Sequence, residues 1–210
     1  MHIRSKSFHD MQPIPAEFAF GKPGPDGEPC VLSDNRNPHL TWSDVPEGTR
    51  SFVLSCIDVD VPTVGDDVNK EGRSVRADLP RTEFVHWVMI DIPLEFREFG
   101  AGACSEGVVP HGKQETFGPP GSKQGLNDYT GWFAGDADMG GDYYGYDGPC
   151  PPWNDERLHR YHFRVVALDV ATLGIDGRFD IADVRKAMAG HVLDEAEIIG
   201  TYSLNAALRR

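Results

Sequence analysis

A mainly β fold, a sandwich with one or two peripheral helices near the C-terminus, is predicted by two features of the sequence. The apolar segments are short, rich in β-branched and aromatic residues, and separated by glycine, proline and aspartate. Only one segment, close to the C-terminus, has a clear helical period. Many short strands with few helices favour a sandwich over an alternating α/β arrangement.

Four segments have the length and composition of strands, and two shorter segments are weaker candidates. The four are residues 50–57, 84–92, 161–169 and 197–204, and the two are residues 3–8 and 40–42.

The predicted helix begins after Asp180, a residue type that caps helix N-termini, and ends at Gly190. Ile181, Val184 and Met188 fall on one face of this helix, at spacings of three and four. We expect a shorter helical turn around residues 194–196.

Two polar segments, at about residues 63–83 and 100–144, are predicted to be long loops. Loops of this length are uncommon unless they are functional or disordered. Neither segment is apolar enough to form a second domain, and we expect a single domain over residues 1–210.

The formal net charge of −13 argues against nucleic acid and anionic membranes as partners, because like charges repel. No segment has the length of an apolar membrane span, and we recognise no apolar leader. The cysteines, at positions 30, 56, 104 and 150, lack the paired spacing of a zinc site. We therefore expect a cytoplasmic protein with reduced thiols, although one disulfide is left open.

Asp58 and Asp60 follow the first long predicted strand and precede Pro62. Residues i and i+2 of a strand point to the same side, and the two carboxylates are therefore expected to lie together. Such a pair could bind a metal, hold a histidine or accept backbone hydrogen bonds. The alternative is an Asx turn that merely ends the strand.

His86, followed by Trp87, lies inside an otherwise apolar predicted strand. An unpaired buried polar group costs about 1–3 kcal/mol, and the imidazole therefore needs a partner. It is either a core histidine with an internal partner or a histidine at a pocket wall that donates to a bound anion.

The most specific motif spans residues 145–161, with three prolines in four positions around Cys150. Prolines stiffen the backbone, and the remaining N–H groups, such as that of Cys150, are then held in fixed directions that can attract an anion. His159 and Tyr161 lie two positions apart as a strand begins and face one side. Arg160 faces the other side, where we expect a structural salt bridge.

Together these motifs resemble the signature of the phosphatidylethanolamine-binding protein (PEBP) family. The resemblance rests on residues 58–62, the His-Trp pair at 86–87 and the Gly-Pro-x-Pro-Pro…His-Arg-Tyr pattern within residues 148–161. Residues 37–42, 190–193 and 200–202 resemble further family segments, the last two of the bacterial and archaeal branch, often called Raf-kinase-inhibitor-like proteins. The resemblance covers about residues 5–203, and the two long loops depart from it.

The resemblance implies a Greek-key β-sandwich with a small anion-binding cavity at one end of a sheet. It implies a protein that binds a phosphate-bearing group, such as a phospholipid headgroup, and that is not an enzyme, with no catalytic residue, cofactor or metal. The ligand-binding residues carried over by motif are Asp58, His86, Cys150 through its backbone, Pro151, Pro152, His159 and Tyr161. The supporting residues are Asp60, Trp87 and Gly148.

In the roles that we expect, His86 and His159 donate hydrogen bonds to the anion, and Tyr161 contributes a hydroxyl and an aromatic wall. Asp58 orients His86 and keeps it protonated, because a nearby carboxylate raises the pKa of a histidine. Asp60 holds the motif in shape by accepting backbone hydrogen bonds. Both long loops are expected to approach the site.

Two other functions stay open. A metal-dependent or hydrolytic enzyme would use Asp58, Asp60, His86 and His159, although the sequence has no HExxH or GxSxG motif. A regulatory protein would capture a phosphorylated side chain of a partner kinase or protease, as the family's animal members suggest. Members of the prokaryotic branch often dimerise, and a homodimer is a further expectation.

Overall fold

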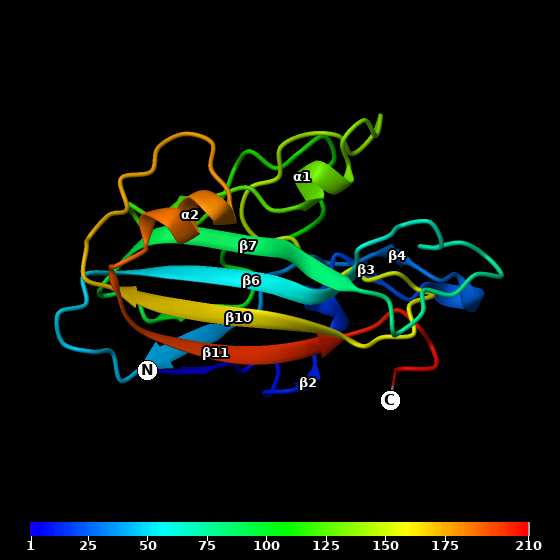
Figure 1. The fold of residues 1–210 in the computed structure, drawn as a ribbon, viewed down its shortest axis with the longest axis horizontal. Helices are drawn as coiled ribbons and strands as arrows, with labels where there is room; N and C mark the ends of the chain where they lie inside the picture. The colour runs from blue at the N-terminus through cyan, green and yellow to red at the C-terminus, as the bar shows by residue number, and fades with distance from the viewer. Residues whose placement is uncertain (210) are drawn as a thin grey trace.

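The computed structural model describes residues 1–209, and its largest element is a six-stranded sheet (Figure 1). All neighbouring strands in this sheet are antiparallel except the first two, which are parallel. In spatial order the strands are β2 (Gln12–Pro13), β11 (Val192–Tyr202), β10 (His159–Leu168), β6 (Ser51–Pro62), β7 (Arg81–Pro93) and β9 (Lys123–Gln124).

A smaller sheet packs against one face of the large one, and a short hairpin lies near the end of the sheet where β6 ends. The smaller sheet consists of β1 (His2–Arg4), β5 (Leu40–Ser43) and β8 (Glu98–Phe99). The hairpin is formed by β3 (Gly21–Lys22) and β4 (Val31–Leu32), and two short 3-10 helices are η1 (Ala16–Phe18) and η2 (Pro25–Gly27).

Side chains on the two faces of the large sheet enter two different cores. Phe52 and Leu54 on β6 pack in one core with Trp42 of the smaller sheet. Val53, which lies between them, packs in the other core with Val184 of α2 (Ile181–Ala187). Successive side chains of a strand point to opposite faces of the sheet, and here both faces are covered. The first half of β6 is therefore apolar throughout and does not alternate.

The expected mainly β fold is confirmed, and each of the four long predicted strands overlaps an observed strand. The predicted helix is confirmed as α2, where Asp180 forms a capping box with Asp183. The helical turn expected at residues 194–196 is wrong, because these residues belong to β11 and pair with residues 165–167 of β10. None of these three residues is buried, and this part of β11 therefore lacks the apolar alternation that marks a strand.

The second helix also lies elsewhere than expected. It is α1 (Tyr129–Trp132), inside the segment that was predicted to be the second long loop, and not near the C-terminus. The same segment contains β9, whereas the first predicted loop ends three residues early because β7 already begins at Arg81.

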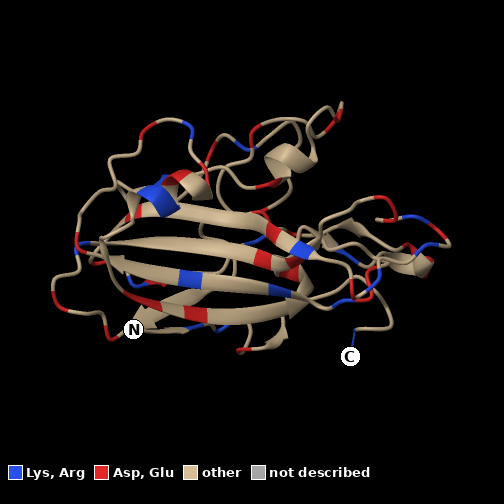
Figure 2. Ribbon diagram, in the orientation of Figure 1, with Lys and Arg blue, Asp and Glu red and all other residues tan. Residues whose placement is uncertain are grey.

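Acidic and basic residues are interspersed on the outward face of the large sheet (Figure 2). Arg164 on β10, for example, pairs with Glu197 on β11 at 3.0 Å. Within residues 1–209, no helix combines the length and the apolar composition that a bilayer crossing requires.

A buried polar cluster around Asp147 holds the segment of residues 100–144 against the rest of the fold. One carboxylate oxygen of Asp147 accepts from Lys113 at 3.0 Å and from Asn35 at 2.7 Å, and the other accepts from Asn127 at 2.7 Å. All four side chains are buried. Lys113 also donates to the carbonyl oxygen of Tyr146.

The replacement Asp147→Ala is therefore expected to lower the free energy of unfolding by about 3–5 kcal/mol, because it leaves the Lys113 ammonium buried without a counter-ion. Denaturant unfolding at pH 7 measures this change. The matched control is Asp138→Ala, at an exposed position in the same segment, which should change stability by less than about 0.5 kcal/mol. A similar small effect for both variants would contradict the prediction.

Candidate functional site

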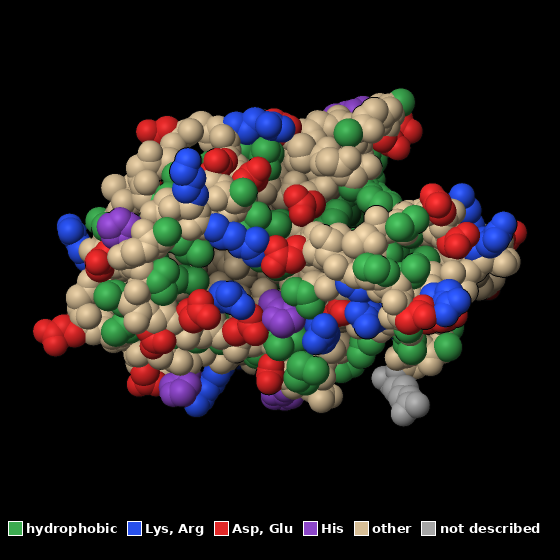
Figure 3. Space-filling view, in the orientation of Figure 1, with side chains coloured by type: hydrophobic (Ala, Val, Ile, Leu, Met, Phe, Trp, Pro, Cys, Tyr) green, Lys and Arg blue, Asp and Glu red, His purple; other side chains and the backbone are tan. Residues whose placement is uncertain are grey.

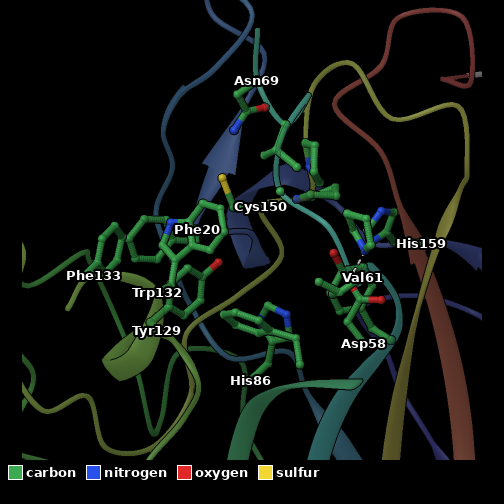
Figure 4. Close-up of a pocket in the computed structure, with 17 residues that line it drawn as sticks. Phe20, Asp58, Val61, Asn69, His86, Tyr129, Trp132, Phe133, Cys150 and His159 are labelled. Carbon is green, nitrogen blue, oxygen red and sulfur yellow. Dashed lines mark hydrogen bonds and ion pairs between the residues drawn. The ribbon is translucent and has the colours of Figure 1, made fainter. Parts of the chain in front are cut away.

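A cavity of about 310 Å³ lies at the end of the large sheet where β6 ends and where β7 and β10 begin (Figure 4). Both long predicted loops contribute to its lining, as expected, through residues such as Val68 and Trp132. In the space-filling view, hydrophobic side chains line the hollow beside the part of the chain that carries α1 (Figure 3). The ligand-binding residues predicted from the sequence all border this cavity: Asp58, His86, Cys150, Pro151, Pro152, His159 and Tyr161.

Asp58 and Asp60 do not share one side, contrary to the prediction. The pairing of β6 with β7 changes register between Asp58 and Val61, which breaks the alternation of the strand. Asp58 faces His159 at 2.6 Å, whereas Asp60 accepts hydrogen bonds from the backbone and the guanidinium of Arg160 at 3.1 and 2.8 Å. The predicted structural salt bridge of Arg160 is thereby confirmed, and Asp60 accepts a backbone hydrogen bond as expected. Asp58 also accepts the backbone N–H of Asp60 in an Asx turn.

His159 is fully buried between two carboxylates. Its Nδ1 lies 2.6 Å from Asp58 Oδ2, and its Nε2 lies 3.1 Å from Asp155 Oδ2. Asp155 in turn accepts two hydrogen bonds from the guanidinium of Arg81, at 2.6 and 3.0 Å. We call this arrangement of Arg81, Asp155, His159 and Asp58 the charge row, because its members alternate in sign and sum to zero when His159 is protonated.

The charge row fixes the protonation of His159. Burial by itself lowers the pKa of His159, but the two carboxylates outweigh burial and raise the pKa to about 9. At neutral pH both ring nitrogens therefore carry a proton, and both protons are donated to carboxylates. The expectation that His159 donates to a bound anion is wrong, because neither N–H is free.

His86 has the opposite character. Its Nδ1 lies 2.8 Å from the backbone carbonyl oxygen of Asp147, which can only accept, and Nδ1 therefore carries the proton. Burial lowers the pKa of His86 and outweighs the attraction of nearby carboxylates, including Asp58. The expectation that Asp58 keeps His86 protonated is wrong, because burial outweighs the attraction of Asp58, which is itself paired with His159. At neutral pH, Nε2 of His86 can accept a hydrogen bond but cannot donate one.

Tyr161 carries a buried hydroxyl that has no hydrogen-bond partner within residues 1–209. Tyr161 is the cross-strand neighbour of Asp58, and its ring lies edge-on to His86 with 5.1 Å between ring centroids. Burial, the negative charge of Asp58 and a contact with the Asp58 carboxylate that falls outside hydrogen-bond geometry raise the pKa of Tyr161 well above its usual value, and the hydroxyl keeps its proton. It is therefore a donor with no internal acceptor in hydrogen-bond geometry, beside the cavity that its residue lines.

The proline-rich loop forms another wall. The backbone N–H of Cys150 makes no hydrogen bond to another described residue, in keeping with the donor role expected for it. Gly148 supports this loop, because a Cβ at this position would lie 2.1 Å from the carbonyl oxygen of Phe18. Trp87 faces away from the cavity and donates its indole N–H to Gln124 in the core.

One side of the cavity is an aromatic wall that the motifs did not indicate, composed of Phe20, Phe84, Tyr129, Trp132 and Phe133. Tyr129 stacks on Phe20 with 4.6 Å between centroids and on Phe133 with 5.6 Å. Asp128 docks α1 on the sheet by accepting the N–H of Val85 at 2.6 Å. The available signal was the density of aromatic residues at positions 129–133, in a segment predicted to be only a loop.

The four residues of the metal-enzyme alternative do not form a common set of ligands, although Asp58, His86 and His159 border the same cavity. Asp60 is paired with Arg160, and Nδ1 of His86 is occupied by a carbonyl oxygen. In the part of the chain that the structure describes, no three His, Cys, Asp or Glu side chains form a group that could hold a metal ion.

The charge row predicts a pH dependence of stability. The pKa of His159 is about 9 in the folded state and about 6.5 in the unfolded chain, and its stabilisation is therefore complete below pH ~6.5 and lost as the pH rises through about 9. We expect wild-type protein to lose about 1–3 kcal/mol of unfolding free energy between pH 6.5 and 9.5. His159→Gln should be less stable at pH 6.5 and nearly flat over this range in urea unfolding. An equally steep profile in the variant would show that another group is responsible.

Comparisons with known proteins identify the family. Residues 4–203 match the family model of phosphatidylethanolamine-binding proteins. The chain is 34% identical over 202 residues to a UPF0098 protein of Aquifex aeolicus, with 96% of this chain and 88% of that protein covered. It is 30% identical over 203 residues to the UPF0098 protein YbhB of Escherichia coli, with 97% and 100% covered. The crystal structure of E. coli YbcL, described as a new member of the mammalian PEBP family, superimposes with a TM-score of 0.68 at 26% identity and covers 96% of this chain and 97% of that chain. This chain therefore belongs to the PEBP family, in its bacterial and archaeal branch.

Proposed function

We propose that this protein binds a small ligand that carries a monoprotonated phosphate group and an apolar body. The observation that carries the proposal is the buried, unpaired hydroxyl of Tyr161 beside the accepting Nε2 of His86. A monoprotonated phosphate matches this pair, because its P–O⁻ accepts from Tyr161 and its P–OH donates to His86. The description of the family supports a phosphate-bearing ligand.

The charge balance of the cavity favours the monoanion over the dianion. No lysine or arginine is among the lining residues, and the positive charge of His159 is neutralised by Asp58 and Asp155. A phosphate dianion would face the lone pair of His86 and the carboxylate of Asp58 without a free cation. Phosphate monoesters lose their second proton near pH 6, and the bound form is therefore favoured by mild acid.

The aromatic wall favours a ligand with an apolar body. A stacked series lies beside the polar residues of the cavity and is formed by Phe20, Tyr129 and Phe133. Trp132 lies at the edge of the cavity, with 55% of its surface exposed. Burial of apolar surface contributes roughly 25 cal/mol per Å². An aryl or alkyl phosphate therefore fits both parts of the cavity. A phosphorylated side chain of a partner protein would present the same group, and a regulatory function stays a hypothesis beside this one.

The lining also favours binding over turnover. It contains no serine, threonine or lysine, and its one thiol belongs to Cys150. The hydrogen bond with Cys30 and burial raise the pKa of the Cys150 thiol well above its usual value, and a protonated thiol is a poor nucleophile.

Tyr161→Phe tests the proposed donor. We expect this variant to bind phenyl phosphate at least about 10-fold more weakly at pH 6 in calorimetric titration, because a hydrogen bond to a charged group is lost. Its stability in urea should not fall, since the hydroxyl has no internal partner. The matched control is Tyr146→Phe, whose buried hydroxyl donates to Phe18 at 2.6 Å; it should lose about 1 kcal/mol of stability and keep its affinity. Unchanged affinity in Tyr161→Phe would sink the proposed binding mode.

A pair of esters tests the proposed proton. Phenyl phosphate should bind roughly 50-fold more tightly at pH 6 than at pH 8, because its second pKa lies near 6. Phenyl sulfate keeps no proton in this range and should bind weakly at both values. Equal tightening of both esters would show that protonation of His86 drives binding instead. Inorganic phosphate at pH 6 should bind more weakly than phenyl phosphate, and Trp132→Ala should narrow that difference.

A further inference from the structure

Cys30 and Cys150 lie 120 positions apart in the sequence, yet their sulfur atoms are 3.8 Å apart. Cys30 directly precedes β4, whose partner strand β3 begins at Gly21. The carbonyl oxygen of Pro149, next to Cys150, accepts the backbone N–H groups of Phe20 and Gly21 at 2.9 and 3.2 Å. Main-chain hydrogen bonds therefore join β3 both to the loop that carries Cys150 and to β4, which follows Cys30, and they hold the two thiols close to each other.

Gly21 makes room for this thiol pair. A Cβ at position 21 would lie 2.5 Å from the sulfur of Cys150 and 2.8 Å from that of Cys30. Any side chain here would force the two sulfur atoms to move. The pair is also partly exposed, whereas Cys56 and Cys104 are buried.

We propose that Cys30 and Cys150 form an oxidisable dithiol, a modification site that takes a small disulfide as its oxidant. A disulfide requires the sulfur atoms to approach from 3.8 Å to about 2.05 Å, a small movement for side chains at partly exposed positions. Because Cys150 lines the ligand cavity, the new bond would tie one wall of that cavity to the β3–β4 hairpin.

The exchange proceeds in two balanced steps. The thiolate of Cys30 attacks one sulfur of the small disulfide, breaks its S–S bond and releases one small thiolate. The thiol of Cys150 loses its proton to solvent and attacks the Cys30 sulfur of the mixed disulfide, which releases the second small thiolate. Two protein thiols and one small disulfide become one protein disulfide and two small thiols. The hydrogen bond from Cys150 lowers the pKa of Cys30, in agreement with Cys30 as the first attacking group.

Incubation of the reduced full-length protein with glutathione disulfide under native conditions tests the proposal. After unfolding and alkylation, peptide mass spectrometry should find Cys30 linked to Cys150, with the loss of two hydrogen atoms, and Cys56 and Cys104 alkylated. The cross-link closes a long loop, and we expect the melting temperature to rise by at least about 4 °C.

Three variants complete the test. Cys30→Ser and Cys150→Ser should each abolish both the cross-link and the temperature shift. Gly21→Ala keeps both thiols but separates them, and it should slow cross-linking at least about 10-fold. Stable glutathione adducts on Cys30 and Cys150 without a cross-link, a link to Cys56 or Cys104, or no oxidation at all would overturn the proposal. None of these outcomes depends on the identity of the phosphate ligand.

Discussion

The charge row is the constraint on which the candidate site depends. Arg81 is the first residue of β7, His159 is the first residue of β10, and Asp58 lies near the end of β6. The ion pairs between Arg81, Asp155, His159 and Asp58 thus join three strand ends and the proline-rich loop at one point. Buried ion pairs contribute little net stability, but they are costly to break. Their effect here is to fix the geometry of the polar residues that line the cavity.

The same interaction determines which hydrogen-bond donors and acceptors the polar residues of the cavity present to a ligand. Because Asp58 and Asp155 occupy both nitrogens of His159, this imidazole is a source of neither free donors nor net charge. His86, bound to a backbone carbonyl oxygen and lowered in pKa by burial, becomes the acceptor. The site is therefore electrically balanced before a ligand enters. That balance is the physical reason why the proposed ligand brings its own proton.

The sequence was sufficient for the four long strands and for part of the cavity lining. Alternation and β-branched content located the four long strands, and the motifs brought His86 and Tyr161 to one cavity. The roles were not predictable, because they depend on contacts between side chains and backbone that the motifs do not specify. Asp58 and Asp155 together raise the pKa of His159, whereas burial lowers the pKa of His86. The carbonyl oxygen of Asp147 determines which nitrogen of His86 carries the proton.

Two local errors have a structural cause. A change in register within β6 turned Asp60 away from Asp58, and a register shift leaves no mark in residue types. The aromatic wall escaped prediction because its members come from segments as distant as Phe20 and Phe133, whose proximity exists only in the folded chain. Sequence patterns therefore located the cavity, whereas long-range contacts determined its chemistry.

Tyr161 differs from the other buried polar groups in what it contributes. The fold gives Asp147 three buried partners and gives the hydroxyl of Tyr146 a backbone acceptor. Tyr161 holds the only hydroxyl among the buried side-chain atoms that lack a partner in residues 1–209. A buried donor without a hydrogen-bond partner lowers the stability of the fold. A ligand oxygen that accepts from it on binding removes this penalty. The aromatic wall lines the same cavity as Tyr161, and in the proposed function a ligand with both a polar head and an apolar body would therefore use both features.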